Sequence, residues 1–323
     1  MNFQNLSKVE TFQAYLDNAF KNGMAQAEAM RKDTTNPNRL FRSKRIEQTR
    51  IQAIGKSLAS ALDTIGKSFP RFDALAPFYQ ELVRCTVDYE QLKKSLGALN
   101  WAKLQVIGLM RKYDTEVGMT MKVERVNKAR IAFSGRVSSV VKQVKDNLTY
   151  LEECRKIMKG YPALKTSVAT IVIAGMPNVG KSTLLAKLTG SKPQVASYPF
   201  TTKRLNFGYD KNGYQYVDTP GLLDRPLEKR NKIERQAILA LKHLATLVVF
   251  MIDPTETCGY PLVEQRALLE EVKKMFNISL IVVANKTDTG ATFKGALSVS
   301  AKEGTGIDEL RAAINAILFQ KAR

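Results

Sequence analysis

A short apolar run that passes directly into a glycine-rich turn and then into a helix-forming segment constrains the fold of this chain more than any other feature. The run Thr170–Ala174 leads into Gly175-Met-Pro-Asn-Val-Gly-Lys-Ser182, and Thr183-Leu-Leu-Ala-Lys-Leu188 follows. This order predicts a P-loop, because backbone N–H groups of the turn can surround phosphates at the helix N-terminus. The predicted phosphate-binding residues are Asn178, Val179, Gly180, Lys181, Ser182 and Thr183.

Residues in and after this turn suit a magnesium–triphosphate complex. Lys181 is expected to reach the β- and γ-phosphate oxygens, and the Ser182 hydroxyl is expected to bind Mg²⁺. Asp218 follows the apolar run Tyr214–Val217 and can hold the same ion, usually through water. The N–H of Gly221 can face the γ-phosphate. We therefore expect catalytic roles for Lys181 and Gly221 and metal binding by Ser182 and Asp218.

Two later apolar runs end in polar residues that suit guanine. Leu280–Ala284 leads into Asn285-Lys286-Thr287-Asp288, and Ser298–Ser300 leads into Ala301-Lys302. The carboxylate of Asp288 can accept both N–H groups on guanine's edge, and adenine has no equivalent donor pair. The sequence therefore predicts GTP or GDP as the cofactor. The predicted base-binding residues are Asn285, Lys286, Asp288, Ser300, Ala301 and Lys302.

The two halves of the chain differ in the spacing of their apolar residues and in their glycine content. Residues 1–166 show helical periodicity and little glycine, whereas short β-branched runs alternate with helical stretches from residue 167 onward. We expect two domains, 1–166 and 167–323. The predicted fold class is α + α/β, an N-terminal antiparallel helical bundle followed by a doubly wound P-loop GTPase domain.

In the first half, apolar residues from Val123 to Leu151 recur at spacings of three, four or seven, which predicts one face of a long helix. Further helices are expected from Asp73 to about Leu96 and from Ala98 to about Tyr113. A helix start is expected after Asn36-Pro37. Four aromatic residues are interpreted as core residues rather than as a base-stacking set: Phe78, Tyr79, Tyr89 and Trp101.

The chain has a net charge of +20, from 50 Lys and Arg against 30 Asp and Glu. Residues 1–166 carry +13 of this charge, and a dense basic cluster runs from Arg31 to Arg50. An RNA partner and an ordinary solvated helix face both remain open as interpretations. The three widely separated cysteines and the absence of a long apolar run predict a cytoplasmic protein without a membrane partner. We further expect a monomer with no DNA partner.

The chain resembles a translation-factor-type GTPase and, among these, the nucleolar GTP-binding protein 1 family in its short archaeal form. In the second half the resemblance rests on Gly175–Ser182, Ala196-Ser-Tyr-Pro-Phe-Thr-Thr-Lys203, Asp218-Thr-Pro-Gly-Leu-Leu-Asp-Arg-Pro226, Gln236-Ala-Ile-Leu-Ala-Leu241 and Asp253-Pro254 with Cys258-Gly259. In the first half it rests on Pro77-Phe-Tyr-Gln-Glu-Leu-Val83, Gly135-Arg-Val137 and Asn147-Leu-Thr-Tyr-Leu151. The resemblance implies a helical domain that docks on large-subunit rRNA or a pre-ribosomal particle.

The resemblance also bears on the segment that responds to the γ-phosphate, the first switch, and on the rate of GTP hydrolysis. A Thr between Ser191 and Tyr209 can complete the Mg²⁺ shell while the γ-phosphate is present, and the family motif favours Thr202, as a metal-binding and catalytic residue, over Thr201. Leu222 stands where Ras-like GTPases carry the Gln that orients water, so slow intrinsic hydrolysis is expected. Asn178 resembles an Asn that coordinates K⁺ in similar GTPases, although it could equally serve the turn.

The segment after Asp288 departs from a typical GTPase domain. Only Thr289–Gly295 separates Asp288 from the run Ala296–Ser300, which is too short for the usual helical crossover between parallel strands. We expect that helix to be missing or reduced to a turn.

Three functions remain open at this stage. The first is a GTP-driven factor for large-subunit assembly, in which hydrolysis acts as a timer. The second is a GTPase of tRNA modification or signalling, and the third is an RNA-binding scaffold that holds nucleotide with negligible turnover. Leu222 keeps the third alternative open.

Overall fold

The computed structural model describes residues 3–33, 37–190, 193–197, 204–218, 223–224, 238 and 240–321. The chain divides into two compact units. We call Gln4–Arg71 with Val87–Lys159 the helical unit, and Met1–Phe3 with Phe72–Thr86 and Gly160–Arg323 the sheet unit. None of the described helices is long and apolar enough to cross a membrane.

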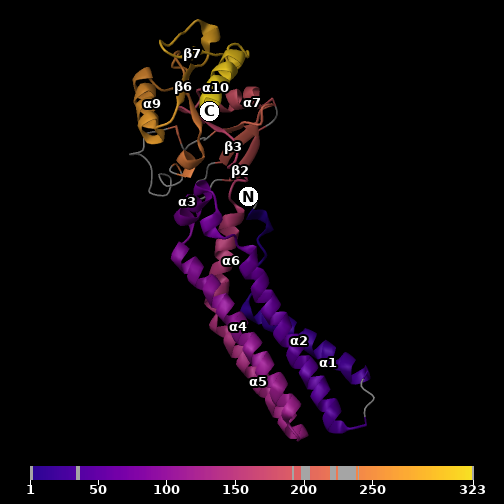
Figure 1. The fold of residues 1–323 in the computed structure, drawn as a ribbon. Coiled ribbons are helices and arrows are strands. Elements are labelled where there is room, and N and C mark those ends of the chain that lie inside the picture. Colours follow the sequence, from indigo (N-terminus) through magenta and orange to yellow (C-terminus); the bar gives the residue numbers. More distant parts are fainter. Residues whose placement is uncertain are drawn as a thin grey trace. The chain divides into compact units, whose positions relative to one another are not determined.

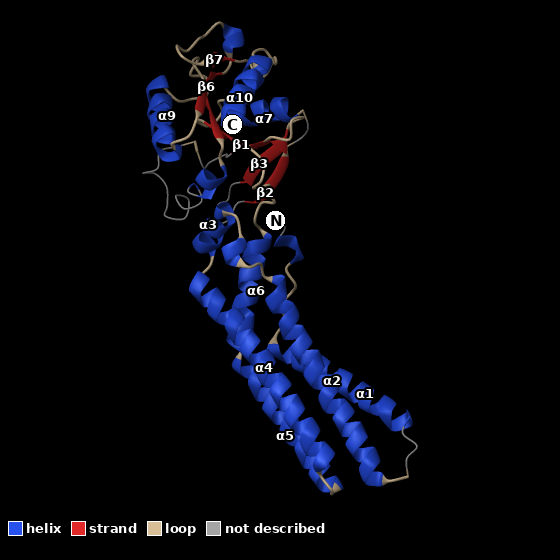
Figure 2. Cartoon of the chain, in the orientation of Figure 1, coloured by secondary structure: helices blue, strands red, loops and turns tan. Residues whose placement is uncertain are grey.

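The helical unit is an antiparallel bundle, as predicted (Figures 1 and 2). Its elements are α1 (Phe12–Asp33), α2 (Arg39–Ser68), α4 (Tyr89–Met119), α5 (Val123–Gln143) and α6 (Lys145–Lys159). Helix α2 packs against α1 and α4, and α4 also packs against α5 and α6. Ile51, Ile54, Val106 and Phe133 are buried in the shared core. Asn38 begins α2, because its side-chain oxygen accepts hydrogen bonds from the N–H groups of Leu40 and Phe41.

The apolar stripe from Val123 to Leu151 lies on two successive helices rather than on one. Val144 (φ −98°, ψ 15°) separates α5 from α6, and its N–H donates to the carbonyl of Val141. Val126, Val137 and Leu148 are buried as the spacing predicts. The break changes the helix count but not the buried face.

The predicted helix boundary at Gly97 is wrong. Gly97 lies inside α4, and the break falls between α3 (Pro77–Thr86) and α4. The carboxylate of Asp88 accepts the N–H of Gln91 at 3.0 Å and so caps α4. A side-chain cap fixes a helix start, whereas a single interior glycine costs only about 1 kcal/mol.

The interpretation of the four aromatic residues is correct in part. Phe78 and Tyr79 are buried and Tyr89 is half-buried, but Trp101 on α4 is 42% exposed and is not a core residue. Helical spacing alone does not separate a buried face from its edge.

Helix α3 belongs to the sheet unit, although bundle helices flank it in the sequence. The Tyr79 hydroxyl lies 2.9 Å from the carbonyl oxygens of both Pro162 and Leu164, and Thr86 hydrogen-bonds to Tyr161. The ring of Phe3 packs against Tyr79 and Tyr161. The division of the chain therefore differs from a single boundary at residue 166.

A seven-stranded sheet forms the centre of the sheet unit, in the order β2-β3-β4-β1-β5-β6-β7. The strands are β1 (Thr170–Ala174), β2 (Gln194–Ser197), β3 (Arg204–Tyr209), β4 (Gln215–Asp218), β5 (Leu247–Ile252), β6 (Leu280–Ala284) and β7 (Leu297–Ser298). From β4 to β7 all neighbours are parallel, while β3 pairs antiparallel with both β2 and β4. β1 and β5 are buried throughout, as their unbroken apolar runs require.

Helices cover both faces of this sheet. Figure 1 shows α9 (Leu262–Phe276) on one side and α7 (Lys181–Thr189) with α10 (Ile307–Lys321) on the other. Between β6 and β7 the chain forms only the 3-10 turn Thr287–Thr289, so the expected loss of the crossover helix is confirmed. The mixed, doubly wound sheet confirms the predicted fold class.

Candidate nucleotide-binding site

The turn between β1 and α7 has the backbone shape that a phosphate loop needs. Gly175 (φ 141°) and Gly180 (φ 101°) adopt left-handed conformations that favour glycine. A Cβ on Gly175 would lie 2.5 Å from the carbonyl oxygen of Met251, and one on Gly180 would overlap Asn285 Nδ2. The buried Lys181 ammonium donates to the carbonyls of Gly175 at 2.9 Å and Met176 at 2.7 Å.

Ser182 and Asp218 lie together at the carboxyl edge of the sheet. The parallel register of β1 and β4 pairs Ile173 with Asp218, which places the carboxylate beside the turn. Ser182 Oγ donates to Asp218 Oδ2 at 2.6 Å, and Asn206 Nδ2 lies 3.2 Å from the same oxygen. A hydroxyl and a carboxylate are hard oxygen ligands of the kind that Mg²⁺ prefers. The other predicted ligand, Thr202, lies outside the described residues, as do Gly221 and Leu222.

The predicted base-binding residues line one pocket of about 400 Å³. Asn285 joins two of its walls, because its Nδ2 donates to the carbonyl of Val179 at 2.7 Å and its Oδ1 accepts the N–H of Ala301 at 2.8 Å. Ser300 Oγ donates to Asp288 Oδ1 at 2.7 Å and so orients that carboxylate. The lining residues are Asn178, Gly180, Thr183, Thr255, Thr257, Asn285, Lys286, Asp288, Thr289, Ser300, Ala301 and Lys302.

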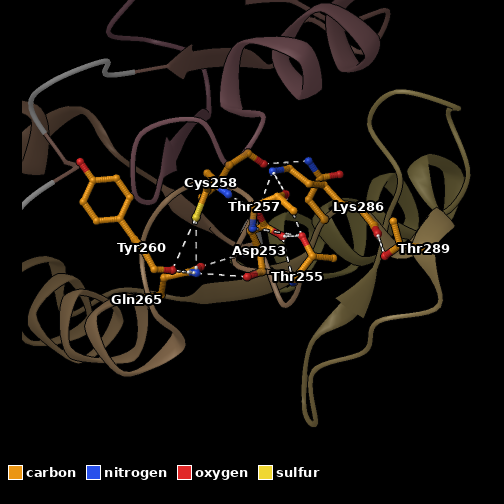
Figure 3. Close-up of polar contacts among 10 residues, drawn as sticks. Asp253, Thr255, Thr257, Cys258, Tyr260, Gln265, Lys286 and Thr289 are labelled. Atoms are coloured by element: carbon orange, nitrogen blue, oxygen red, sulfur yellow. Dashed lines mark hydrogen bonds and ion pairs between the residues drawn. The ribbon is translucent and has the colours of Figure 1, made fainter.

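Thr255 and Thr257 form a wall of this pocket that the sequence did not predict. Both belong to the loop after β5, which is organised around the fully buried carboxylate of Asp253 (Figure 3). Asp253 Oδ2 accepts hydrogen bonds from Lys286 Nζ at 2.6 Å, Cys258 N at 2.8 Å and Thr257 Oγ1 at 3.1 Å. Lys286 Nζ also donates to Thr257 Oγ1 at 2.7 Å.

Gln265 on α9 holds the same loop from its other side. Its Oε1 accepts the N–H of Asp253 at 2.8 Å, and its Nε2 donates to the carbonyls of Tyr260 at 2.8 Å and Asp253 at 3.1 Å. Figure 3 shows these contacts converging on the loop. Asp253 directly follows a buried parallel strand, so its position at the carboxyl edge was the signal that could have revealed this wall.

Two opposing influences set the pKa of Asp253. Burial is the larger single influence and raises the pKa, because it disfavours the charged form. The hydrogen bonds from Lys286, Thr255 and Cys258 lower it, and together they hold the pKa of this carboxyl below its ordinary value. Asp253 is therefore a carboxylate at neutral pH and a fixed counter-charge for Lys286.

Asn178 lies in the turn with φ 61° and lines the pocket. Asn tolerates this left-handed conformation better than most residues, which suits the turn interpretation. Its place on the pocket wall suits the K⁺ hypothesis, so both roles remain predictions.

No group of three or more His, Cys, Asp or Glu side chains suited to a metal ion occurs in the described part of the chain.

The doubly wound sheet, the glycine turn before α7 and the pocket beyond β6 together define the fold of a P-loop GTPase. Comparison with known proteins then gives the family. The NOG1 N-terminal helical domain matches residues 3–164, and the nucleolar GTP-binding protein 1 (NOG1) family matches residues 232–288. The chain therefore belongs to the nucleolar GTP-binding protein 1 family of GTP-binding proteins.

The chain is also similar to individual known proteins. An uncharacterized protein of Methanocaldococcus jannaschii is 43% identical over 77% of this chain and 71% of its own length. Nucleolar GTP-binding protein 1 of Encephalitozoon cuniculi is 36% identical over 74% of this chain, but the match spans only 46% of that protein. A solved structure of a candidate nucleolar GTP-binding protein 1 from Plasmodium falciparum is 30% identical, covers 50% of this chain and 92% of that one, and has a TM-score of 0.44.

Proposed function

We propose that this protein binds and hydrolyses GTP as a molecular switch and assists assembly of the large ribosomal subunit by binding rRNA. The observation that carries the GTP proposal is the pocket in which Asn285, Asp288 and Ala301 lie beside the glycine turn. The excess of basic residues in the helical half and the family supply the proposal for RNA. The matched relatives named nucleolar GTP-binding protein 1 are more than twice as long as the matching segment, so their full activity is carried over only as a proposal.

The residues of the turn fit a magnesium–nucleotide complex. Ser182 and Asp218 would hold Mg²⁺, which neutralises phosphate charge when it is bound. The Lys181 ammonium now contacts two carbonyls of the turn and would exchange them for phosphate oxygens. We assign the remaining metal contact to Thr202 and the γ-phosphate contact to the N–H of Gly221, as the sequence predicts.

Asp288 would supply the selectivity for guanine. Its carboxylate is already oriented by Ser300 and faces the same pocket as Ala301. Adenine would cover this carboxylate without offering it a donor pair, and an acceptor left unpaired in this way costs about 1–3 kcal/mol. Asp288→Asn should therefore weaken GTP binding by roughly ten- to a hundredfold, and Ser300→Ala should have a smaller effect, as measured with a fluorescent GTP analogue.

Hydrolysis should be slow in the isolated protein. Leu222 cannot orient a water molecule, so the missing electrostatic help must come from the ribosomal partner or from a monovalent cation. We assign the cation site to K⁺ beside Asn178. Single-turnover rates should be higher in K⁺ than in Na⁺ at equal ionic strength, and equal rates would contradict this assignment.

The rRNA proposal is tested by crosslinking the protein to RNA in its own cells. Wild type and Lys181→Ala are compared, because loss of the P-loop ammonium should impair the nucleotide-bound state. We expect crosslinks concentrated in large-subunit rRNA and altered in yield by Lys181→Ala. Crosslinks scattered over tRNA or messenger RNA would instead favour a GTPase of tRNA modification or signalling.

A second assay separates a timer from a scaffold. Purified large subunits are added to the protein under multiple-turnover conditions, and released phosphate is followed. Acceleration supports a switch that is reset by hydrolysis. Unchanged turnover together with large-subunit crosslinks would contradict the timer and support the scaffold.

A further inference from the structure

The helical unit concentrates its positive charge at one end. We define the bundle tip as residues 31–33, 39–50 and 111–130, which are the end of α1, the start of α2, the end of α4 and the start of α5. The tip contains thirteen basic and five acidic residues, a net charge of +8. The whole unit has 27 basic and 14 acidic residues, a net charge of +13, so the tip carries +8 of this +13 on 35 of the 141 residues.

Contacts between the helices show that these segments form one surface. Lys44 Nζ donates to the carbonyl of Gly118 at 2.9 Å, and Gln48 Nε2 donates to the carbonyl of Asp114 at 3.1 Å. Figure 1 shows the end of α1, the start of α2, the end of α4 and the start of α5 at the same end of the bundle. The basic clusters of α2 and α5, which are distant in the sequence, are thus neighbours.

A shallow groove of about 670 Å³ runs between the end of α4 and the start of α5. Its lining includes the exposed cations Lys112, Arg125 and Lys128, and Glu116 is the carboxylate among the lining residues. Three cations against one carboxylate leave an excess that an extended anion can neutralise.

A second group of cations lies between α2 and α5. The buried Glu47 carboxylate is shared by Arg50, at 3.2 Å, and Arg130, at 3.6 Å. The Nε atoms of Arg42, Arg50 and Arg130 are buried and have no hydrogen-bond partner among the described residues. Because two guanidinium groups share one carboxylate, this group keeps a net positive charge that attracts phosphates.

Large apolar side chains stand exposed on the same tip. Met119 and Met121 are 75% and 81% exposed, and Phe41 at the start of α2 is 46% exposed. Met119 lines the groove together with Lys112, Arg125 and Lys128. Exposed apolar groups beside cations suit nucleotide bases, which offer apolar faces beside charged phosphates. Paired bases inside a helix are not accessible in this way, so the apolar groups favour an unpaired segment.

We infer that the bundle tip is the surface with which this protein binds RNA. Lys112, Arg125 and Lys128 contact backbone phosphates, and Phe41, Met119 and Met121 pack against unpaired bases of a loop. This inference rests on the proposed RNA-binding function and specifies the surface and the kind of RNA.

The test compares two triple variants of the full chain with the same change in charge. The first is Lys112→Ala, Arg125→Ala and Lys128→Ala at the tip, and the second is Lys94→Ala, Lys142→Ala and Lys145→Ala away from it. Binding of a fluorescent RNA hairpin with an unpaired loop is measured over a salt series. The salt slope of log K should become shallower by about 2–3 in the tip variant, as three lost phosphate contacts require, and should change little in the control.

A third variant tests the apolar part, and further outcomes separate the proposals. Phe41→Ala with Met119→Ala and Met121→Ser should weaken loop binding but leave binding of a fully paired duplex unchanged.

Equal losses in the tip and control triples would overturn the inference, even if crosslinks to large-subunit rRNA confirmed the proposed function. Binding to vesicles of anionic lipid that exceeds binding to RNA would also overturn it. Helicity and nucleotide affinity are measured for every variant, because a fall in either would show misfolding.

Discussion

Asp253 organises one wall of the pocket. Its buried carboxylate accepts hydrogen bonds from the Lys286 ammonium, the Thr257 hydroxyl and the N–H of Cys258. Its position after β5 sets the loop, and the loop in turn sets where Thr255 and Thr257 meet the pocket. Lys286 is thereby held at the pocket wall by contacts within the protein before a nucleotide binds.

Asp253→Asn should therefore weaken GTP binding and lower stability. The amide keeps the size of the side chain but leaves the Lys286 ammonium without its counter-charge, and hydrogen bonds to charged groups contribute about 1.5–3 kcal/mol. We expect a rise of about tenfold or more in the Kd for GTP, measured by calorimetry. Asp308→Asn is the matched control, since the Asp308 side chain is 99% exposed; equal affinities of the two variants would contradict the role of Asp253.

The lowered pKa of Asp253 also predicts a pH dependence. A carboxyl whose folded pKa lies below its unfolded value stabilises the fold above the unfolded value, and this contribution is lost as the pH falls through the folded pKa. The free energy of unfolding of wild type should thus decrease as the pH falls below about 3.8, the ordinary value. Asp253→Asn should show a smaller decrease over the same range in urea titrations.

The sequence predicts Asn285, Asp288 and Ala301 as base-binding residues, and the structure places all three on one pocket, because each follows an apolar run that forms a parallel strand. Thr255 and Thr257 were missed because nothing in a Thr-Glu-Thr segment indicates a ligand. Their place depends on the buried carboxylate of Asp253, two and four residues before them, whose position at the end of an apolar run was the available signal.

At the scale of elements, α4 shows that a capping side chain determines a helix boundary more strongly than an interior glycine does. Gly97 lies within the helix, whereas Asp88 determines where the helix begins. Such a choice depends on competing local interactions of about 1 kcal/mol, so a pattern of apolar spacing cannot decide it.

Asp88→Ala should consequently destabilise the helical unit by about 1 kcal/mol. The N–H of Gln91 would lose its side-chain acceptor, while the rest of the helix keeps its contacts. Asp88→Asn retains a capping oxygen and should restore most of the loss. Denaturant unfolding followed by circular dichroism measures both variants, and equal losses in the two would argue against a cap.

The edge strand β2 and its neighbour β3 were not predicted, whereas the short connection from β6 to β7 was. The segment between Asp288 and the next apolar run is too short for a helix, so the number of residues alone predicts the short connection. By contrast, β2 (Gln-Val-Ala-Ser) and β3 (Arg-Leu-Asn-Phe-Gly-Tyr) lack the unbroken apolar run of β1 and β5. β2 pairs with β3, and β3 also pairs with β4, so sheet pairing rather than an apolar run defines these two strands.

For the whole molecule, the nucleotide should stabilise one unit and not the other. All described pocket residues lie between Asn178 and Lys302, within the sheet unit. GTP at a hundredfold excess over its Kd should stabilise that unit by about 2.7 kcal/mol. In calorimetry with Mg²⁺ one unfolding transition should move to higher temperature while the other stays; a common shift of both would show that the two units unfold together.

The bundle and the doubly wound domain were predictable as wholes, because helical and strand periodicities occupy separate halves of the sequence. The assignment of α3 was not predictable. Its partners, Pro162 and Leu164, lie 83 and 85 residues from Tyr79, and no local pattern reveals so distant a pairing.

This distant pairing has a consequence during synthesis. At about 5–20 residues per second, the ribosome makes Pro162 some 4–17 s after Tyr79, so a nascent α3 exists before its partner segment has been translated. Through that interval the side chains of Phe78 and Tyr79, which are buried in the finished protein, lack their native surroundings. The nascent chain therefore offers an apolar helix to chaperones, and a polypeptide released early, before residue 160, should aggregate more readily than the full-length product.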